Sequence, residues 1–216
     1  MTRRDVVGFV TVLILTVPVA VTVWAAAPPG NQLREAVEQI LRIAEDPDLK
    51  RPARIAERRA AIRRIATEIF DFQEITKRTL GPHWQPRTPA EREEIVRLVA
   101  GLLERAYISK IELYSGERIT YTGDAVDGDL ATVRTRVVTK QGTDIPVEYR
   151  MVRRGERWLA YDVIIEGVSL VANYRGQFNK ILQASSYADL VRRLRAKLDD
   201  QADETESRVR RASDQN

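Results

Sequence analysis

The feature that most constrains the fold is a change of hydrophobic period in the middle of the chain. Up to Ile111 the apolar residues recur three and four apart, as on one face of a helix, whereas residues 118–165 alternate between apolar and polar positions, as in strands. The four alternating runs are joined by the short turn sequences DGD, KQGTD and RRGER. Sequential strands with short joints pair antiparallel. Because helical spacing returns after Gly167, the sequence predicts an α+β fold with an antiparallel sheet of four to five strands packed by helices.

Amphipathic helices are expected on both sides of this sheet. Apolar residues recur at helical spacing over residues 31–45 and 52–69, and the arginine-rich face of the second helix is expected to be solvated. Thr88 and Glu91 form a capping-box signature at the start of the longest predicted helix. This helix and the one that follows Gly167 are expected to cover one face of the sheet.

Composition excludes several classes of site. The 216 residues are 44% hydrophobic and 31% charged, which is typical of a globular domain. The chain has no cysteine and one histidine, His83, so disulfides and thiolate catalysis are excluded and a histidine metal cluster or catalytic triad is disfavoured. The net charge of +4 is mild, and the arginines have acidic neighbours, so no nucleic-acid partner is expected.

The two ends of the chain differ from the middle. Residues 1–25 combine Arg3 and Arg4 with a long uncharged run that ends at Val23-Trp24-Ala25, which is typical of a cleaved export signal. An uncleaved inner-membrane anchor is the alternative, because the run is long enough to span a bilayer. In both cases residues 26–199 form the folded domain outside the cytoplasm, and residues 200–216 form a polar, disordered tail.

The apolar face of the sheet and the helices beside it are candidates for an apolar cavity. A sheet covered by helices on one face often leaves a space that binds a ligand. The candidate residues are Leu102, Leu103, Tyr107 and Ile111 on the long helix, Val133, Val137, Val147, Tyr149, Val163 and Ile165 on the strands, and Tyr174 and Phe178 on the helix after Gly167.

Two blocks of sequence resemble a known family. The first, FDFQEITKRTLGPHW, contains F-D-F followed by L-G-x-x-W, and the second is IPVEYRMV followed by WLAYDVIIEGVSLVANYRGQF. They are similar to the hallmark motifs of the MlaC-type periplasmic phospholipid-binding proteins, also called toluene-tolerance proteins, and the resemblance covers about residues 31–198. The chain departs from the commoner pattern at Ile75, where methionine or leucine is frequent, at Gly176, where serine is usual, and in its unusually long leader.

The resemblance implies a function. Members of this family carry phospholipid through the periplasm as the soluble component of an ABC-type transport system that maintains outer-membrane lipid asymmetry. They hold the acyl tails in a cavity between sheet and helices, and they exchange lipid with an outer-membrane lipoprotein complex and with an inner-membrane ABC transporter complex that has a lipid-transfer subunit. Phospholipid is then the cargo, no cofactor or metal is expected, and a hopanoid-related lipid is the alternative cargo. Arg175 and Arg63 are candidates for contact with the head group or with a partner.

An enzyme remains the competing class. Asp162 beside Tyr161 resembles the acid–base site of isomerases with a cone-shaped α+β fold, and such chemistry requires one of these side chains to point into the cavity. Strict alternation instead places Asp162 and Glu166 on the face opposite Val163 and Ile165. The sequence therefore favours a carrier without catalytic residues.

Overall fold

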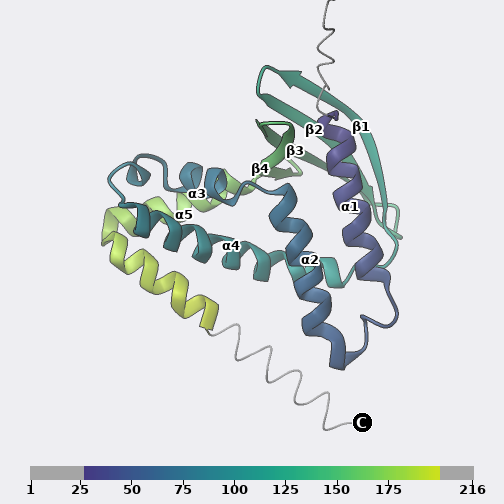
Figure 1. Ribbon diagram of the computed structural model, residues 1–216, viewed down its shortest axis with the longest axis horizontal. Helices are drawn as coiled ribbons and strands as arrows, with labels where there is room; N and C mark the ends of the chain where they lie inside the picture. The colour runs from purple at the N-terminus through teal and green to yellow at the C-terminus, as the bar shows by residue number, and fades with distance from the viewer. Residues whose placement is uncertain (1–26, 200–216) are drawn as a thin grey trace, which may run out of the picture.

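The computed structural model describes residues 27–199, so the predicted leader and the predicted polar tail lie outside the described residues. Two helices precede a short third one and a long fourth one, and a meander of strands leads into the last helices (Figure 1). The elements are α1 (Pro29–Glu45), α2 (Ile55–Ile69), α3 (Phe72–Leu80), α4 (Pro89–Glu112), β1 (Arg118–Asp127), β2 (Leu130–Val138), β3 (Asp144–Arg154), β4 (Arg157–Ile165), β5 (Val168–Ser169), α5 (Leu170–Ala184) and a final helix over residues 187–199, with 3-10 turns at Pro52–Arg54 and Gly81–Trp84. None of the helices within residues 27–199 combines the length and the hydropathy that crossing a bilayer requires.

Side chains cap the starts of α3 and α4. The Asp71 carboxylate accepts a hydrogen bond of 2.8 Å from the Glu74 amide at the start of α3. At the start of α4 the Thr88 amide donates to the Glu91 carboxylate at 2.8 Å, and the Glu91 amide donates to the Thr88 hydroxyl at 3.3 Å. This reciprocal pair confirms the capping box, and it satisfies two amides that have no partner within the helix.

The sheet is a meander in the order β1-β2-β3-β4-β5 with antiparallel neighbours, as predicted. Its fifth strand consists of Val168 and Ser169, which the sequence assigns to the following helix. Glu166 and Gly167 make the tight turn before it, with φ of 50° and 81°. Pairing of Val168 with Ile165 therefore inserts a short strand between β4 and α5.

Cross-strand register confirms which residues share the predicted apolar face. Val133 lies opposite Tyr149, and Tyr149 lies opposite Val163. Directly paired residues point to the same side of a sheet, so these side chains share one face, called here the inner face. The other paired sets on this face are Ile119, Val137 and Ile145, and Tyr121, Thr135, Val147 and Ile165.

A bulge in β4 explains the break in alternation that the sequence shows at Tyr161. Arg150 pairs with Asp162, whereas Met151 pairs with Ala160, so Tyr161 is the extra residue on β4. An extra residue restores the side chains beyond it to the inner face and increases the local twist of the strand. The side chains of Trp158 and Val163 therefore lie on the same face, although strict alternation would place them on opposite faces.

The helices cover the sheet differently from the prediction. The structure places α1 against β1, β2 and β4, and α2 against β4, while α3 and α5 also approach β4 (Figure 1). The sequence predicts that α4 lies directly on the sheet together with α5. This prediction is wrong for α4, whose close neighbours are α1, α2 and α3. α1 and the end of α2 pack instead on the part of the inner face that belongs to the sheet cluster.

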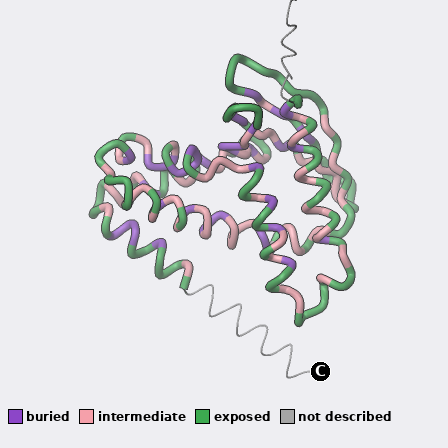
Figure 2. The backbone as a smooth tube through the Cα atoms, viewed as in Figure 1, coloured by how far each residue is buried: buried purple, intermediate pink, exposed green. Residues whose placement is uncertain are grey.

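Buried and exposed residues alternate along the helices (Figure 2). Most buried hydrophobic residues within 27–199 form two clusters. The helical cluster is made mainly by α3, α4, α5 and the helix over 187–199; its fully buried members include Leu80, Ile95, Val99 and Leu190. The sheet cluster is made by α1, the end of α2 and the inner face; its members are Leu33, Ile69, Ala131, Val133, Met151, Trp158 and Ala160. Phe70, between α2 and α3, packs against both clusters.

Candidate functional site

Besides Ile119 on β1, five aliphatic residues of the inner face belong to neither cluster. These residues, called here the aliphatic patch, are Val137, Ile145, Val147, Val163 and Ile165. Val147 is 6% exposed and the other four are partly buried. They occupy the end of the sheet where β2 finishes and β3 begins. Side chains of this kind offer an acyl chain a surface without hydrogen-bonding groups.

The inner face is more polar beside the patch. Thr135 is buried, and its hydroxyl donates to the Val147 carbonyl at 3.1 Å. Burial raises the pKa of Tyr149 to about 12, and it raises the pKa of Tyr121 above its usual range. The Tyr121 hydroxyl is buried and has no hydrogen-bond partner among the described residues. Val133 is 1% exposed and belongs to the sheet cluster. Tyr149 packs against this cluster.

The helical candidates fall into two groups. Leu102, Leu103 and Phe178 are buried members of the helical cluster, where close packing already accounts for them. Tyr107 and Tyr174 are partly buried against the same cluster, and burial raises the pKa of both phenols. Each tyrosine therefore combines an apolar ring with a hydroxyl near the cluster surface.

Ile111 differs from the other helical candidates. It lies in the last turn of α4, is partly buried and belongs to neither cluster. It is the α4 candidate that most resembles the aliphatic patch in its surroundings.

The two arginines predicted to meet a head group have partners within the chain. Arg175 donates from Nε to the Arg78 carbonyl at 2.7 Å, which ties α5 to the last turn of α3. Arg63 donates from Nε to the Glu104 carboxylate of α4 at 2.7 Å. The prediction of a solvated arginine face on α2 is wrong for Arg58, which is 6% exposed. Arg63 keeps a side chain that is 54% exposed beside Glu104, and the Arg59 side chain, 27% exposed, pairs with Glu112. A head-group role for Arg175 or Arg63 stays a prediction.

The predicted acid–base pair is built into the joint between β4 and α5. Asp162 is 4% exposed and lies on the outer face, opposite Arg150. Its carboxylate accepts hydrogen bonds from the Ser169 hydroxyl at 2.7 Å and from the Val171 amide at 3.0 Å. Tyr161 packs in the helical cluster with the Arg78 guanidinium 4.0 Å above its ring. These contacts give Asp162 a structural role in starting α5.

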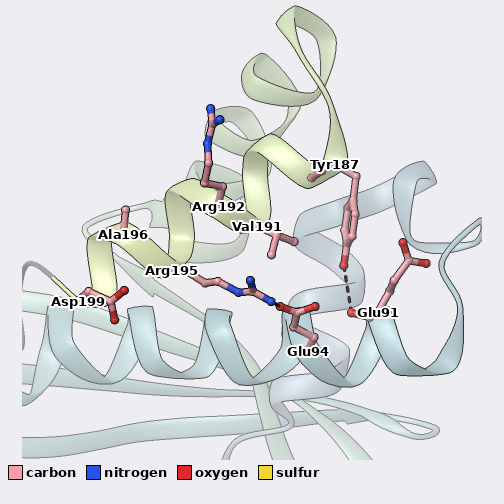
Figure 3. A pocket seen from close by; sticks show the side chains of 9 residues that line it. Glu91, Glu94, Tyr187, Val191, Arg192, Arg195, Ala196 and Asp199 are labelled. Atoms are coloured by element: carbon pink, nitrogen blue, oxygen red, sulfur yellow. Dashed lines mark hydrogen bonds and ion pairs between the residues drawn. The ribbon is translucent and has the colours of Figure 1, made fainter.

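A groove of about 510 Å³ lies between α4 and the helix over 187–199, and sequence reasoning missed it. Charged side chains line much of it: Arg195 pairs with Glu94, and the Tyr187 hydroxyl donates to the Glu91 carbonyl at 3.0 Å, while Arg192 points away from α4 (Figure 3). No group of three or more His, Cys, Asp or Glu residues within 27–199 is arranged to hold a metal ion.

Comparison with known proteins points to one family. A family model described as "MlaC protein" matches residues 34–196, which covers both sequence blocks quoted above. The toluene tolerance protein ttg2D of Pseudomonas putida is 26% identical over 125 residues, 57% of this chain and 58% of that protein. The intermembrane phospholipid transport system binding protein MlaC of Haemophilus influenzae is 22% identical over 131 residues, 56% of this chain and 61% of that protein. The chain thus spans about three fifths of the length of these curated relatives.

A solved structure has the same fold. The phospholipid-binding protein from Ralstonia solanacearum, determined in complex with a phospholipid, aligns with a TM-score of 0.72 over 82% of this chain and 99% of that chain. The two sequences are 24% identical in this alignment. The agreement confirms the α+β architecture predicted from the hydrophobic period.

Proposed function

Because the chain belongs to the MlaC family, as the match over residues 34–196 shows, we propose that it is a lipid carrier that binds the acyl chains of a phospholipid against the aliphatic patch. The Ralstonia structure supports this, since a protein of the same fold was obtained with a phospholipid. Ile111 and the rings of Tyr107 and Tyr174 are proposed to complete the site from the helical side.

The observation that carries the proposal is the division of the apolar residues. A domain of this size usually has one contiguous core. Here most buried apolar residues of the described chain form two clusters that Phe70 links, and the five residues of the aliphatic patch belong to neither. Four of the five are only partly buried, so they present apolar surface that an apolar ligand can cover.

The physical chemistry of lipid transfer explains why such a patch is useful. Each methylene group costs about 0.8 kcal/mol to expose to water, so a chain of about sixteen carbons costs on the order of 12 kcal/mol. A carrier removes most of this barrier by covering the tails with aliphatic side chains. Binding of this kind requires neither a nucleophile nor a proton donor. The structural use of the Asp162 carboxylate therefore favours a carrier over an enzyme.

The transport role extends this proposal. We infer that the protein works in the periplasm and shuttles lipid between the outer and inner membranes as the soluble component of an ABC-type system. The name of the Haemophilus relative, a binding protein of an intermembrane phospholipid transport system, supports this inference, as does the export signal predicted in the sequence. The proposed partners are an inner-membrane transporter complex with a lipid-transfer subunit and an outer-membrane lipoprotein complex.

Lipid extraction with two matched tryptophan variants tests the proposal. Val137 and Arg136 are neighbours on β2, but Val137 lies on the inner face and Arg136 is exposed on the outer face, where it pairs with Asp144 at 2.8 Å. The full chain and the V137W and R136W variants are purified from the periplasm of a Gram-negative host, and bound lipid is identified by mass spectrometry. We expect phospholipid on the wild type and on R136W and a marked loss on V137W. Folded wild-type protein without any two-tailed lipid would contradict the proposal, and a hopanoid in the extract would identify the alternative cargo.

A further inference from the structure

α2 and the C-terminal half of α4 are joined by two ion pairs, called here the ionic seam. Arg59 donates from Nε and Nη2 to the two carboxylate oxygens of Glu112, at 2.7 and 2.9 Å. Arg63 binds Glu104 through Nε and Nη2 in the same two-pronged manner, with 2.7 Å for the Nε contact. Both glutamates lie on α4, so two charge-assisted contacts join these two helices.

Arg58 adds a buried charge to the same region. Arg58 is only 6% exposed. Its Nη2 donates to the Ala44 carbonyl at 3.0 Å and to the Glu112 carbonyl at 3.3 Å. These bonds bring the ends of α1 and α4 to α2. Arg58 Nε is buried and has no acceptor among the described residues. An unsatisfied buried donor destabilises the closed arrangement, and water would satisfy it if the helices separated.

Apolar residues that belong to neither cluster lie on the same helix segments. Ile62 and Ile65 on α2 are 2% and 3% exposed, and Ile108 on α4 is 6% exposed. All three are absent from the helical and sheet clusters. The two helices therefore carry aliphatic side chains next to the ionic seam, and an acyl chain that passed between the helices would meet them.

We propose that the acyl chains of the cargo enter and leave between α2 and α4, through the ionic seam. The inference rests on the proposed lipid-binding function. Ion pairs that water reaches separate at little cost because both ions regain hydration. The Arg63–Glu104 side chains are 54% and 22% exposed, and the Arg59–Glu112 side chains are 27% and 17% exposed. Each helix keeps an anchor during the separation, since Ile69 of α2 is in the sheet cluster and Leu102 of α4 is in the helical cluster.

The segment between α2 and α3 is suited to serve as the pivot. Phe70 packs against both clusters, and the Asp71 amide donates to the Ala160 carbonyl of β4 at 2.9 Å. This junction holds the two clusters together while the ionic seam, farther along α2, separates.

A reversible cross-link tests the route. Because the chain has no cysteine, the double variant R63C/E104C carries thiols only at the seam. The replaced side chains are too long for their Cα atoms to come within direct disulfide range, so a short bis-methanethiosulfonate reagent bridges the two positions. A matched control, R64C/E68C, places the same bridge between exposed positions one turn apart within α2. Transfer of a fluorescent phospholipid to acceptor vesicles is then followed before and after reduction.

The expected result is that the R63C/E104C bridge abolishes transfer in both directions and that reductant restores it, while the R64C/E68C bridge has no effect. Transfer at an unchanged rate through a quantitatively bridged seam would overturn the route. Failure of the wild type to take up lipid would instead overturn the proposed function, so the two failures are distinguishable.

Charge reversal gives an independent measurement that needs no reagent. Loss of the Arg63–Glu104 attraction in R63E is expected to speed lipid exchange about fivefold, the factor that corresponds to about 1 kcal/mol. The swapped double variant R63E/E104R restores the pair and should return the rate toward that of the wild type. Equal rates for R63E and the wild type, with both proteins folded by circular dichroism, would contradict the proposal.

Discussion

Replacement of Asp162 by alanine should destabilise the domain strongly, although its side chain lies on the face of the sheet opposite the aliphatic patch. The Asp162 carboxylate accepts from the Ser169 hydroxyl and from the Val171 amide, and the residue is 4% exposed. The Val171 amide lies in the first turn of α5, where amides have no partner within the helix. In D162A both donors lose a charged acceptor in a place that water reaches poorly.

The magnitude follows from these two bonds. A hydrogen bond to a charged group contributes about 1.5 kcal/mol at the low end of its range, so the loss of both predicts destabilisation by about 3 kcal/mol. For a domain of this size, each kcal/mol lowers the melting temperature by about 2–4 °C, which gives a decrease of about 6–12 °C. The D162N variant keeps one acceptor and the shape of the side chain, so its loss should be intermediate.

Urea unfolding followed by far-UV circular dichroism measures this free energy. D129A is the control, because Asp129 is an exposed carboxylate that pairs with Arg153 on the surface. Its expected change is within about 0.5 kcal/mol. If D162A unfolded at the same urea concentration as D129A, the assignment of Asp162 to the β4–α5 joint would be refuted, and a role for its carboxylate in chemistry would have to be reconsidered.

Three further predictions concern single contacts. Glu166 has φ of 50° before Gly167 in a two-residue turn. Because asparagine adopts this conformation more readily, E166N should raise the free energy of unfolding by about 0.5–1 kcal/mol. A lower melting temperature for E166N would contradict this prediction. Thr88 caps α4, so T88A should cost about 1 kcal/mol in urea unfolding while T88S stays near the wild type; equal losses would count against the cap. Burial raises the pKa of Tyr149 to about 12, so the unfolded chain loses this proton first and stability should fall from about pH 10 to pH 12. Urea midpoints across this range should fall less for Y149F, and identical curves would refute the reasoning.

The sequence predicts the sheet well because its signals are local. Alternation and short turns are sufficient for the order of the strands, and the same alternation places Val133, Tyr149 and Val163 on one face, as the register confirms. The bulge at Tyr161 is visible as a slip in that alternation. The caps at Asp71 and Thr88 are equally local, since each is a contact over three residues.

Contacts between distant segments are what the sequence does not reveal. Glu104 and Glu112 follow Arg63 and Arg59 by 41 and 53 residues, and nothing in the arginine-rich pattern of α2 distinguishes a paired face from a solvated one. The predicted position of α4 is wrong for the same reason. Periodicity shows that a helix has an apolar side, but it does not show which neighbour covers that side.

The division of the candidate site also depends on packing. Val147 and Phe178 are both apolar and both mostly buried, yet Phe178 belongs to the helical cluster and Val147 to neither cluster. Hydrophobicity alone gives the same prediction for both. The distinction between a core residue and a candidate ligand contact requires the coordinates.

Photo-cross-linking tests the central claim most directly, that acyl chains lie against the aliphatic patch. The full chain is loaded with a phospholipid that carries a diazirine near the end of one acyl chain, irradiated and digested, and the labelled residues are identified by mass spectrometry. Labels are expected on Val137, Val147 or Val163 and their inner-face neighbours. Labels confined to the outer face around Arg136, or to the groove between α4 and the helix over 187–199, would contradict it.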